Sequence, residues 1–549
     1  MSKQSGIGLC LCFLSLTAIG QHVSDDRLKE LMLIQQLLQN STPSYSTPSL
    51  LVNPNQVSTH IFDSLAAKPA NYLLNRKAVK IRMMPLGYIQ QATSVLPYDI
   101  NGGSMLPARG DQLLASAGFH ASIGKKIQIQ IAPEWVMAAN KNYEGFSQQL
   151  GNRAWADRYR FWNTIDIPEQ FGQGSINQLF LGQSFLKYQI NKISIGLSTQ
   201  NLWWGPGNKN ALIMSTNAPG FLHWSVETNQ PIQTNIGAFE GQIIGGELTN
   251  SGIEPPRINT VYNGNFVYQP KRNATRYMSG MMLSWRPKWT PNLYLGFAKS
   301  SYLYSADITS PLDYLPLQGF FGKAITNTEK NNQKASMGSL FIRYIIPKDN
   351  AELYLEFGRK EQMLTPLDFI TSDAFRRAYI VGFRKLFPTK NNAHILFAAE
   401  LTQMQAQTAE FIRNPDSWYS HNYVREGYTN RGRSMGAGIG PGSNSQTLEI
   451  AWVKGLKRIG LQFERLRHHS DFYYYAFEYT REFRRHWIDL STNLKVDWHF
   501  KNLFLSGQFG LIRSYNYKWL IIQVDPNNFF VPGNEILNVA GKLSLKYRF

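Results

Sequence analysis

Apolar and polar residues alternate along most of the chain beyond residue 76. In residues 488–500 the apolar positions are Ile488, Leu490, Leu494, Val496, Trp498 and Phe500, and most residues between them are polar. Because successive side chains of a β-strand point to opposite faces, this period of two predicts strands with one apolar and one polar face. The same alternation recurs in residues 126–131, 339–346 and 395–401.

Short and long connections alternate between the predicted strands. The short joints are residues 124–125, 230–231, 347–350, 388–391, 455–456 and 501–502, and the long ones include 93–110, 140–174, 248–274, 303–333, 407–444 and 516–534. A soluble β-sandwich would also alternate in hydrophobicity, but only an up-and-down membrane barrel requires short periplasmic turns and long external loops. We therefore expect an all-β fold, a transmembrane up-and-down antiparallel β-barrel of about 18 strands over residues 77–549, in the outer membrane of a Gram-negative bacterium.

One pair of predicted strands carries opposite charges on its polar face. Arg343 comes before the short joint 347–350, and Glu352 and Glu356 follow it, all on the face predicted to point inward. Charges on facing strands pair across a turn, so we expect these three side chains to form an ionic group inside the barrel.

The N-terminal region has a different pattern. Residues 1–20 read as a secretory signal, with Lys3, an apolar stretch from Ile7 to Leu16 and small residues before Gln21. Residues 21–76 predict a helical and linker segment that could plug the periplasmic end, with a helix over 24–40, a Ser/Thr/Pro/Asn-rich linker over 40–55 and a second helical piece over 60–75. Beyond the signal, no stretch approaches the ~18 uninterrupted apolar residues of a membrane-spanning helix.

The chain ends in an alternating strand with an aromatic last residue. Leu543, Leu545, Tyr547 and Phe549 share one face of this strand, and Lys542, Ser544, Lys546 and Arg548 share the other. A terminal aromatic residue of this kind resembles the signal that the barrel-assembly machinery reads during insertion. We expect Tyr547 and Phe549 to serve as that insertion signal.

Composition narrows the class of partner. The formal net charge is +19, which favours anionic partners such as lipopolysaccharide phosphates or an acidic polysaccharide. Nucleic acid is an unsuitable partner, because the chain is secreted and has no recognisable nucleic-acid-binding motif. Both cysteines, Cys10 and Cys12, lie in the signal, so a mature chain would have no disulfide and would depend on the hydrogen bonds of a closed barrel.

One motif carries a family resemblance. Residues 201–220 contain Trp203, Trp204, Gly205, Pro206 and Gly207, followed by the segment 212–218 with Asn217. This segment resembles the Trp-Trp-Gly-Pro-Gly motif of Wzi-type capsule assembly proteins, and residues 86–91, 101–103 and 107–110 resemble the opening strand and loop of that family. The resemblance implies an outer-membrane barrel with plugging N-terminal helices, which acts as a surface lectin that retains capsular polysaccharide. It assigns no sugar-contacting residue.

The residues of the motif indicate a local structure of their own. Gly205 and Gly207 around Pro206 permit a sharp turn at the end of a strand. Trp203 and Trp204 would then place one indole toward lipid and the other toward the lumen. The apolar run 211–214 is unsuited to an external loop, so we expect a loop that turns inward and narrows the barrel. An aromatic girdle followed by an ordinary turn is the alternative.

Two predicted external loops combine aromatic and arginine residues. Trp155 and Arg158 lie in the first loop, and Trp418, Arg425 and Arg433 lie in the second. Aromatic faces stack on sugar rings, and guanidinium groups bind carboxylates and phosphates. These five residues are the candidate ligand-binding set, for capsular polysaccharide or exopolysaccharide, with contacts to outer-membrane lipids and lipopolysaccharide as the alternative role.

No catalytic, metal or cofactor site emerges from the sequence. The glycine-rich run 436–442 lacks the Lys-Ser/Thr of a phosphate-binding loop, and His468, His469 and Asp471 have no second cluster of ligands. Ser491 and His499 on one predicted strand lie too far apart for proton transfer. We therefore expect a non-enzymatic polysaccharide-binding barrel without a cofactor. A porin-like or oligosaccharide-specific channel is the alternative, because about 18 strands can also enclose an aqueous lumen.

Overall fold

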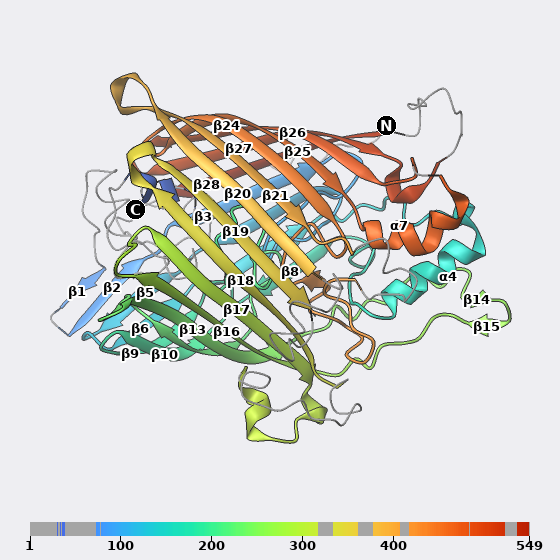
Figure 1. Ribbon diagram of the computed structural model, residues 1–549, viewed down its shortest axis with the longest axis horizontal. Coiled ribbons are helices and arrows are strands. Elements are labelled where there is room, and N and C mark those ends of the chain that lie inside the picture. Colours follow the sequence, from blue (N-terminus) through green and yellow to red (C-terminus); the bar gives the residue numbers. More distant parts are fainter. Residues whose placement is uncertain are drawn as a thin grey trace, which may run out of the picture.

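The computed structural model describes residues 30, 33–34, 36–38, 73–76, 78–316, 333–360, 377–406, 417–482, 484–521 and 535–547. Over these residues the protein is built on one 24-stranded antiparallel sheet, and two short hairpins complete the β-structure (Figure 1). In the first half of the chain the strands are β1 (Leu74–Asn75), β2 (Val79–Met83), β3 (Leu86–Thr93), β4 (Gly110–Ser116), β5 (Phe119–Ile123), β6 (Ile127–Ile131), β7 (Glu134–Ala138), β8 (Ile176–Phe180), β9 (Phe185–Ile190), β10 (Ile193–Ser198), β11 (His223–Thr228), β12 (Ile232–Thr234), β13 (Gly237–Leu248), β14 (Val261–Tyr262) and β15 (Asn265–Phe266).

The second half continues the same sheet. Its strands are β16 (Arg276–Pro287), β17 (Leu293–Tyr304), β18 (Ala335–Ile346), β19 (Ala351–Lys360), β20 (Arg377–Pro388), β21 (His394–Gln403), β22 (Thr429–Asn430), β23 (Arg433–Ser434), β24 (Asn444–Lys454), β25 (Lys457–Arg467), β26 (Ile488–Phe500), β27 (Leu503–Tyr515) and β28 (Ile536–Tyr547). The α-helices with described bounds are α4 (Gly151–Trp162) and α7 (Ser470–Phe477).

The strands follow one another around a barrel. Each long strand pairs with the next one in the chain, and β28 pairs back onto β3, with Leu545 opposite Tyr88. The strand number differs from the expected count of about 18, because breaks at 84–85, 117–118, 132–133 and 181–184 divide the first four expected strands into β2 to β9. At one break, a Cβ on Gly118 would lie 2.2 Å from the Ile131 carbonyl oxygen, so the chain bends where only glycine fits. The short strands β1 and β12 account for the remaining difference.

The two faces of the sheet have the predicted character. On β18, Leu340 is 50% exposed on the outer face, whereas Arg343 is 1% exposed on the inner face. The chain alternates between a tight turn and a long connection, so the tight turns gather at one end of the barrel and the long loops at the other. Figure 1 shows α4 and α7 together at the loop end, away from the C-terminus. Neither helix was expected, because both were assigned to irregular external loops.

A described part of the N-terminal segment packs into the barrel at the tight-turn end. Residues 30, 33–34 and 36–37 are helical, and Ile34 and Leu37 are buried against Tyr294, Leu386 and other side chains near the tight turns. The Arg343 guanidinium donates to Glu352 Oε2 at 2.7 Å and to the Gln36 side chain, so the predicted pairing of Arg343 with Glu352 is present. Glu356 does not join this group, because its carboxylate accepts a hydrogen bond from the backbone N–H of Leu212. The expected signal, the linker, residues 60–72 and Phe549 lie outside the described residues.

Candidate functional site

The chain leaves the sheet after β10 and returns at β11, and residues 199–222 between them form the inner loop. This excursion limits β10 and β11 to six residues each. Gly205 has a φ of +114°, and a Cβ on Gly207 would lie 2.0 Å from the Asn210 carbonyl oxygen, so the turn requires both glycines. The loop turns inward as expected, and its apolar run from Ala211 to Met214 is buried.

The two tryptophans of the motif differ from their expected placement. Trp203 and Trp204 are both buried, and neither faces lipid. Trp203 Nε1 donates to the Gly207 carbonyl oxygen at 3.0 Å, and Trp204 Nε1 donates to Gln242 Oε1 at 2.8 Å. The assumption that they occupy opposite faces of one strand was wrong, because the chain has already left the strand at this point.

The carboxylate of Glu400, on the inner face of β21, holds the turn of the inner loop. Its oxygens accept hydrogen bonds from the backbone N–H groups of Asn208, Lys209 and Asn210 at 2.6, 3.0 and 2.9 Å. Tyr354 Oη donates to the same carboxylate at 2.8 Å. A carboxylate that accepts several backbone N–H groups in a buried site is a strong anchor. Glu400 was not among the predicted site residues, although its place between apolar Ala399 and Leu401 marks it as inward-facing.

Other anchors attach the inner loop to distant strands. Lys209 Nζ lies 2.8 Å from Glu449 Oε2 on β24, and the Leu212 N–H donates to Glu356 on β19. The bond from Trp204 to Gln242 reaches β13, which is separated from β21 by β16 to β20. The inner loop therefore spans the interior of the barrel.

Residues 417–443, here called the cap loop, form a second layer across the interior. Tyr419 Oη donates to the Leu212 carbonyl oxygen at 2.8 Å and accepts from the Ala437 N–H at 2.7 Å. The Ser215 N–H donates to the Met435 carbonyl oxygen at 2.8 Å. A Cβ on Gly436 would lie 2.3 Å from the Leu212 carbonyl oxygen. The glycine-rich run 436–442 thus permits close packing between the two layers.

Arg433, expected to contact a ligand, instead connects three loops. Its Nη2 lies 2.6 Å from Asp99 Oδ2, and both side chains are buried. The same guanidinium donates to the carbonyl oxygens of Gly103 and Met105 and, at 3.1 Å, to Asn217 Oδ1. Arg433 thereby joins the cap loop, the loop that follows β3 and the inner loop, and it gives Asn217 of the sequence motif a structural partner.

Three further expected ligand-binding residues are buried beneath the external loops. Trp155 is 1% exposed and Trp418 is 2% exposed, and Arg158 is also buried. Trp155 and Arg158 lie on the inner side of α4, where the Arg158 guanidinium lies 4.6 Å from the Trp162 ring centroid and 3.6 Å from Glu169. Burial lowers the pKa of Arg158 despite the nearby carboxylate. These three side chains are therefore not exposed on the described surface, and their role in ligand binding stays a prediction.

Exposed arginines lie over the same loops. Arg425 of the expected set is half-buried, and its guanidinium donates to the Gln269 side chain at 2.9 Å. The Arg153 guanidinium lies 3.8 Å from the ring centroid of Tyr479, and that of Arg272 lies 4.7 Å from the ring centroid of Tyr423. We call Arg153, Arg160, Arg257, Arg272 and Arg425 the arginine face; all except Arg425 are exposed. In the sequence, the mixture of arginine with aromatic residues indicated a binding surface in these loops. That mixture did not distinguish exposed positions from buried ones.

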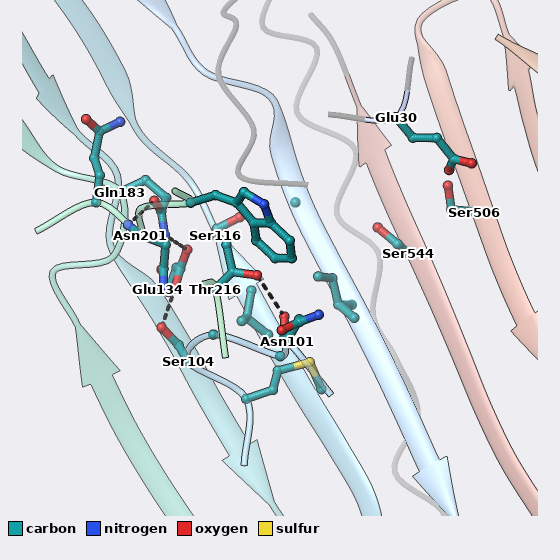
Figure 2. A pocket seen from close by; sticks show the side chains of 18 of the residues that line it. Glu30, Asn101, Ser104, Ser116, Glu134, Gln183, Asn201, Thr216, Ser506 and Ser544 are labelled. Carbon is teal, nitrogen blue, oxygen red and sulfur yellow. Dashed lines mark hydrogen bonds between the residues drawn. The ribbon is translucent and has the colours of Figure 1, made fainter. Parts of the chain in front are cut away.

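A polar pocket of about 410 Å³ lies beside the inner loop (Figure 2). Glu134 accepts hydrogen bonds from Ser104 and from Gln183, and Gln183 also donates to Asn201 at 2.9 Å. Glu30, from the N-terminal segment, lies across the pocket from these residues, near Ser506 and Ser544. Ser544, Lys542 and Lys546 all line the pocket, as the predicted inward face of the last strand requires.

Ser417, His469 and Asp471 lie together beneath the external loops. Ser417 Oγ lies 3.2 Å from His469 Nε2, but burial holds the pKa of His469 well below its usual range. Burial also raises the pKa of Asp471 to about 6, and its carboxylate accepts a hydrogen bond from the Ala406 N–H. Among the described residues, no group of three or more His, Cys, Asp or Glu is placed to hold a metal ion. In the same part of the chain, no helix combines the length and apolar character needed to cross a membrane.

Comparison with known proteins assigns the family. A family model for the capsule assembly protein Wzi matches residues 106–502. The chain belongs to the Wzi family. This assignment confirms the resemblance of the Trp-Trp-Gly-Pro-Gly segment, which lies inside the matched region. As a member of the Wzi family with a β-barrel fold, the chain is an outer-membrane protein.

Solved structures share the barrel fold. Wzi of Escherichia coli, described as an outer-membrane, carbohydrate-binding β-barrel involved in group 1 capsule assembly, is 11% identical, with a TM-score of 0.58. The likeness covers 97% of this chain and 100% of the E. coli chain. OccAB2 of Acinetobacter baumannii is 10% identical over 85% of this chain and 97% of its own, with a TM-score of 0.40. A comparison with curated protein sequences found no match.

Proposed function

We propose that the protein binds capsular polysaccharide at its external face and retains it on the cell surface, without cleaving it. Membership of the Wzi family supports this function, and the E. coli protein that shares the fold is described as carbohydrate-binding. The observation that carries the proposal is the pair of loops that cross the interior of the barrel. The inner loop and the cap loop cross the barrel in two hydrogen-bonded layers. A long polymer can therefore bind only at the external surface.

The arginine face supplies the chemistry for an acidic polymer. Planar guanidinium groups form paired hydrogen bonds with carboxylates or phosphates, and exposed tyrosine rings such as Tyr479 can stack on sugars. The arginines lie on several loops of one end of the barrel, so a chain of sugars can contact many of them at once. Many contacts of this kind together give a high avidity, even though each single contact is weak.

A porin-like channel is the second candidate function. The polar pocket beside the inner loop favours it, because amide, hydroxyl and charged side chains line a water-filled path well. Conduction would still require the solute to pass the inner loop and the cap loop, each of which is held by buried hydrogen bonds. We therefore place the polysaccharide-binding function first.

Neutralising the arginine face is expected to weaken binding of an acidic polysaccharide. Replacing Arg153, Arg257, Arg272 and Arg425 together by glutamine should reduce affinity by about tenfold at low salt and flatten its salt dependence, because the lost attraction is screened by ions. Surface plasmon resonance with a purified acidic capsular polysaccharide measures both effects. Size-exclusion chromatography of the recovered polymer should show an unchanged length.

The matched control removes four positive charges from the opposite end. Replacing Lys125, Lys192, Lys348 and Lys390 by glutamine leaves the external loops intact and should leave affinity unchanged. Equal affinity of wild type and the arginine variant would contradict the assignment of the arginine face. Shortening of the polymer by wild type would contradict a non-enzymatic role.

The proposed partners also include molecules of the membrane. Tyr547 lies on the exposed, outer side of β28 and Phe549 follows it by two residues, which suits an insertion signal for the barrel-assembly machinery. The apolar outer face of the strands suits acyl chains, and the arginine face also suits lipopolysaccharide phosphates. Lipid and polysaccharide binding at this face would then compete.

A further inference from the structure

Exposed lysines occupy the tight turns of the barrel. Across the described residues, eight of them lie on seven turns or at the strand end beside one: Lys125 and Lys126 between β5 and β6, Lys192 between β9 and β10, Lys288 between β16 and β17, Lys348 between β18 and β19, Lys390 between β20 and β21, Lys454 at the end of β24, and Lys501 between β26 and β27. We call this set the lysine collar. The topology places the whole collar at one end, because in an antiparallel barrel every second connection lies at the same end.

The lysine collar is almost unopposed by acidic residues. On the turns that carry the collar, the described acidic residue is Asp349, which follows Lys348 and whose carboxylate lies 3.9 Å from Lys385. No ion pair involves a collar lysine within the described part of the chain. A rim of unneutralised positive charge attracts anions, and it does so around most of the circumference.

Exposed aromatic residues accompany the collar. Trp289 follows Lys288 directly and is 67% exposed, and Phe500 precedes Lys501 and is 58% exposed. Nearby, Lys457 Nζ lies 4.1 Å from the ring centroid of Trp498. In membrane barrels, exposed aromatic rings form a girdle at the boundary between acyl chains and headgroups. The lysines therefore lie at the level of the lipid headgroups.

We infer that the lysine collar binds the anionic headgroups of phospholipids in the periplasmic leaflet, phosphatidylglycerol in particular. The tight turns define the periplasmic side of a barrel, and that leaflet consists of phospholipid. A docked protein would contact one side of the rim, whereas lipids surround it entirely, as the distribution of the collar requires. Each lysine near the membrane surface adds to the attraction for acidic lipid. This inference does not depend on polysaccharide binding.

Spin-labelled lipids test the inference on the full-length protein in vesicles. Wild type should bind spin-labelled phosphatidylglycerol at least about threefold more strongly than spin-labelled phosphatidylcholine, and high salt should reduce this preference. The variant with Lys192→Gln, Lys288→Gln, Lys348→Gln, Lys390→Gln and Lys454→Gln should lose most of the preference. A variant with the same lysines replaced by arginine should keep it, because the charge is retained.

Two controls separate the collar from other sources of charge. The variant with glutamine at all five positions of the arginine face removes the same number of charges from the other end and should keep the lipid preference. Inorganic phosphate at the concentration of lipid phosphate should not displace the labelled lipid. Heat-modifiable gel mobility verifies that each variant is folded. An unchanged preference in the lysine-to-glutamine variant would overturn the inference, as would a wild type that binds both lipids equally or binds only a soluble acidic polymer.

Discussion

Replacing Arg433 with alanine is expected to lower the free energy of unfolding by about 3–5 kcal/mol, because it leaves the buried Asp99 carboxylate without its cation. The substitution also removes the donor to the Met105 carbonyl oxygen and to Asn217 Oδ1, so three loops lose a common attachment. Urea unfolding in lipid vesicles, followed by tryptophan fluorescence, measures the change.

Arg431 offers a matched control two residues away. Its side chain is exposed and lies over the ring of Phe180, so Arg431→Ala should change stability by less than about 1 kcal/mol. Arg433→Lys should fall between the two, because an ammonium group keeps the charge opposite Asp99 but cannot reproduce the fork of hydrogen bonds. Equal stability of the Arg433→Ala and Arg431→Ala proteins would show that Arg433 does not connect the loops.

Glu400→Leu is expected to destabilise the inner loop by about 3 kcal/mol or more, because each buried donor left without an acceptor costs about 1–3 kcal/mol. The N–H groups of Asn208, Lys209 and Asn210 lose their shared acceptor, and Tyr354 loses its own. Detachment of the turn should also make the loop accessible to protease. Limited proteolysis with mass spectrometry would find new cleavage between residues 203 and 214.

Two variants calibrate the Glu400 result. Glu400→Gln keeps one acceptor oxygen at the turn and should recover part of the stability. Glu478→Leu removes a carboxylate from the exposed turn after α7 and should leave the inner loop protected. Protection of residues 203–214 in the Glu400→Leu protein would mean that other contacts hold the loop in place.

The sequence predicts the wall of the barrel well, because one physical rule governs it. Outer side chains contact lipid, and inner side chains contact water or polar loops. The alternation at Leu340, Ile342 and Arg343 therefore indicates which side chains point outward and which point inward. The Trp-Trp-Gly-Pro-Gly segment likewise indicated an inward turn, since the apolar run 211–214 has no reason to face solvent. Pro85, Gly118 and Pro133 are residues that favour a break in a strand, so the sequence indicated where these strands bend. The number of strands still depends on whether each bend is counted as the end of a strand.

The external loops were less predictable, because their burial depends on tertiary packing. Trp155, Tyr159 and Trp162 are spaced by four and three residues, which is the period of one helix face, and that face of α4 is buried. A mixture of arginine and aromatic residues suits both a sugar-binding surface and a packed interior. Composition alone therefore placed Arg158 and Arg433 at the surface, although both are buried. Glu400 was missed because its partners are backbone N–H groups far away in the sequence, which no side-chain pattern reveals.

Conductance of the purified full-length protein in planar lipid bilayers tests most directly whether the inner loop and the cap loop obstruct the lumen and leave the function to the external surface. The layers formed by the inner loop and the cap loop predict no sustained single-channel steps in wild type. A barrel of about 18 strands with an open lumen would instead give large, stable ohmic steps, as porins do. Absence of such steps, with binding of acidic polysaccharide in the same preparation, is the expected result. Large stable steps in wild type would contradict it and make the protein a channel.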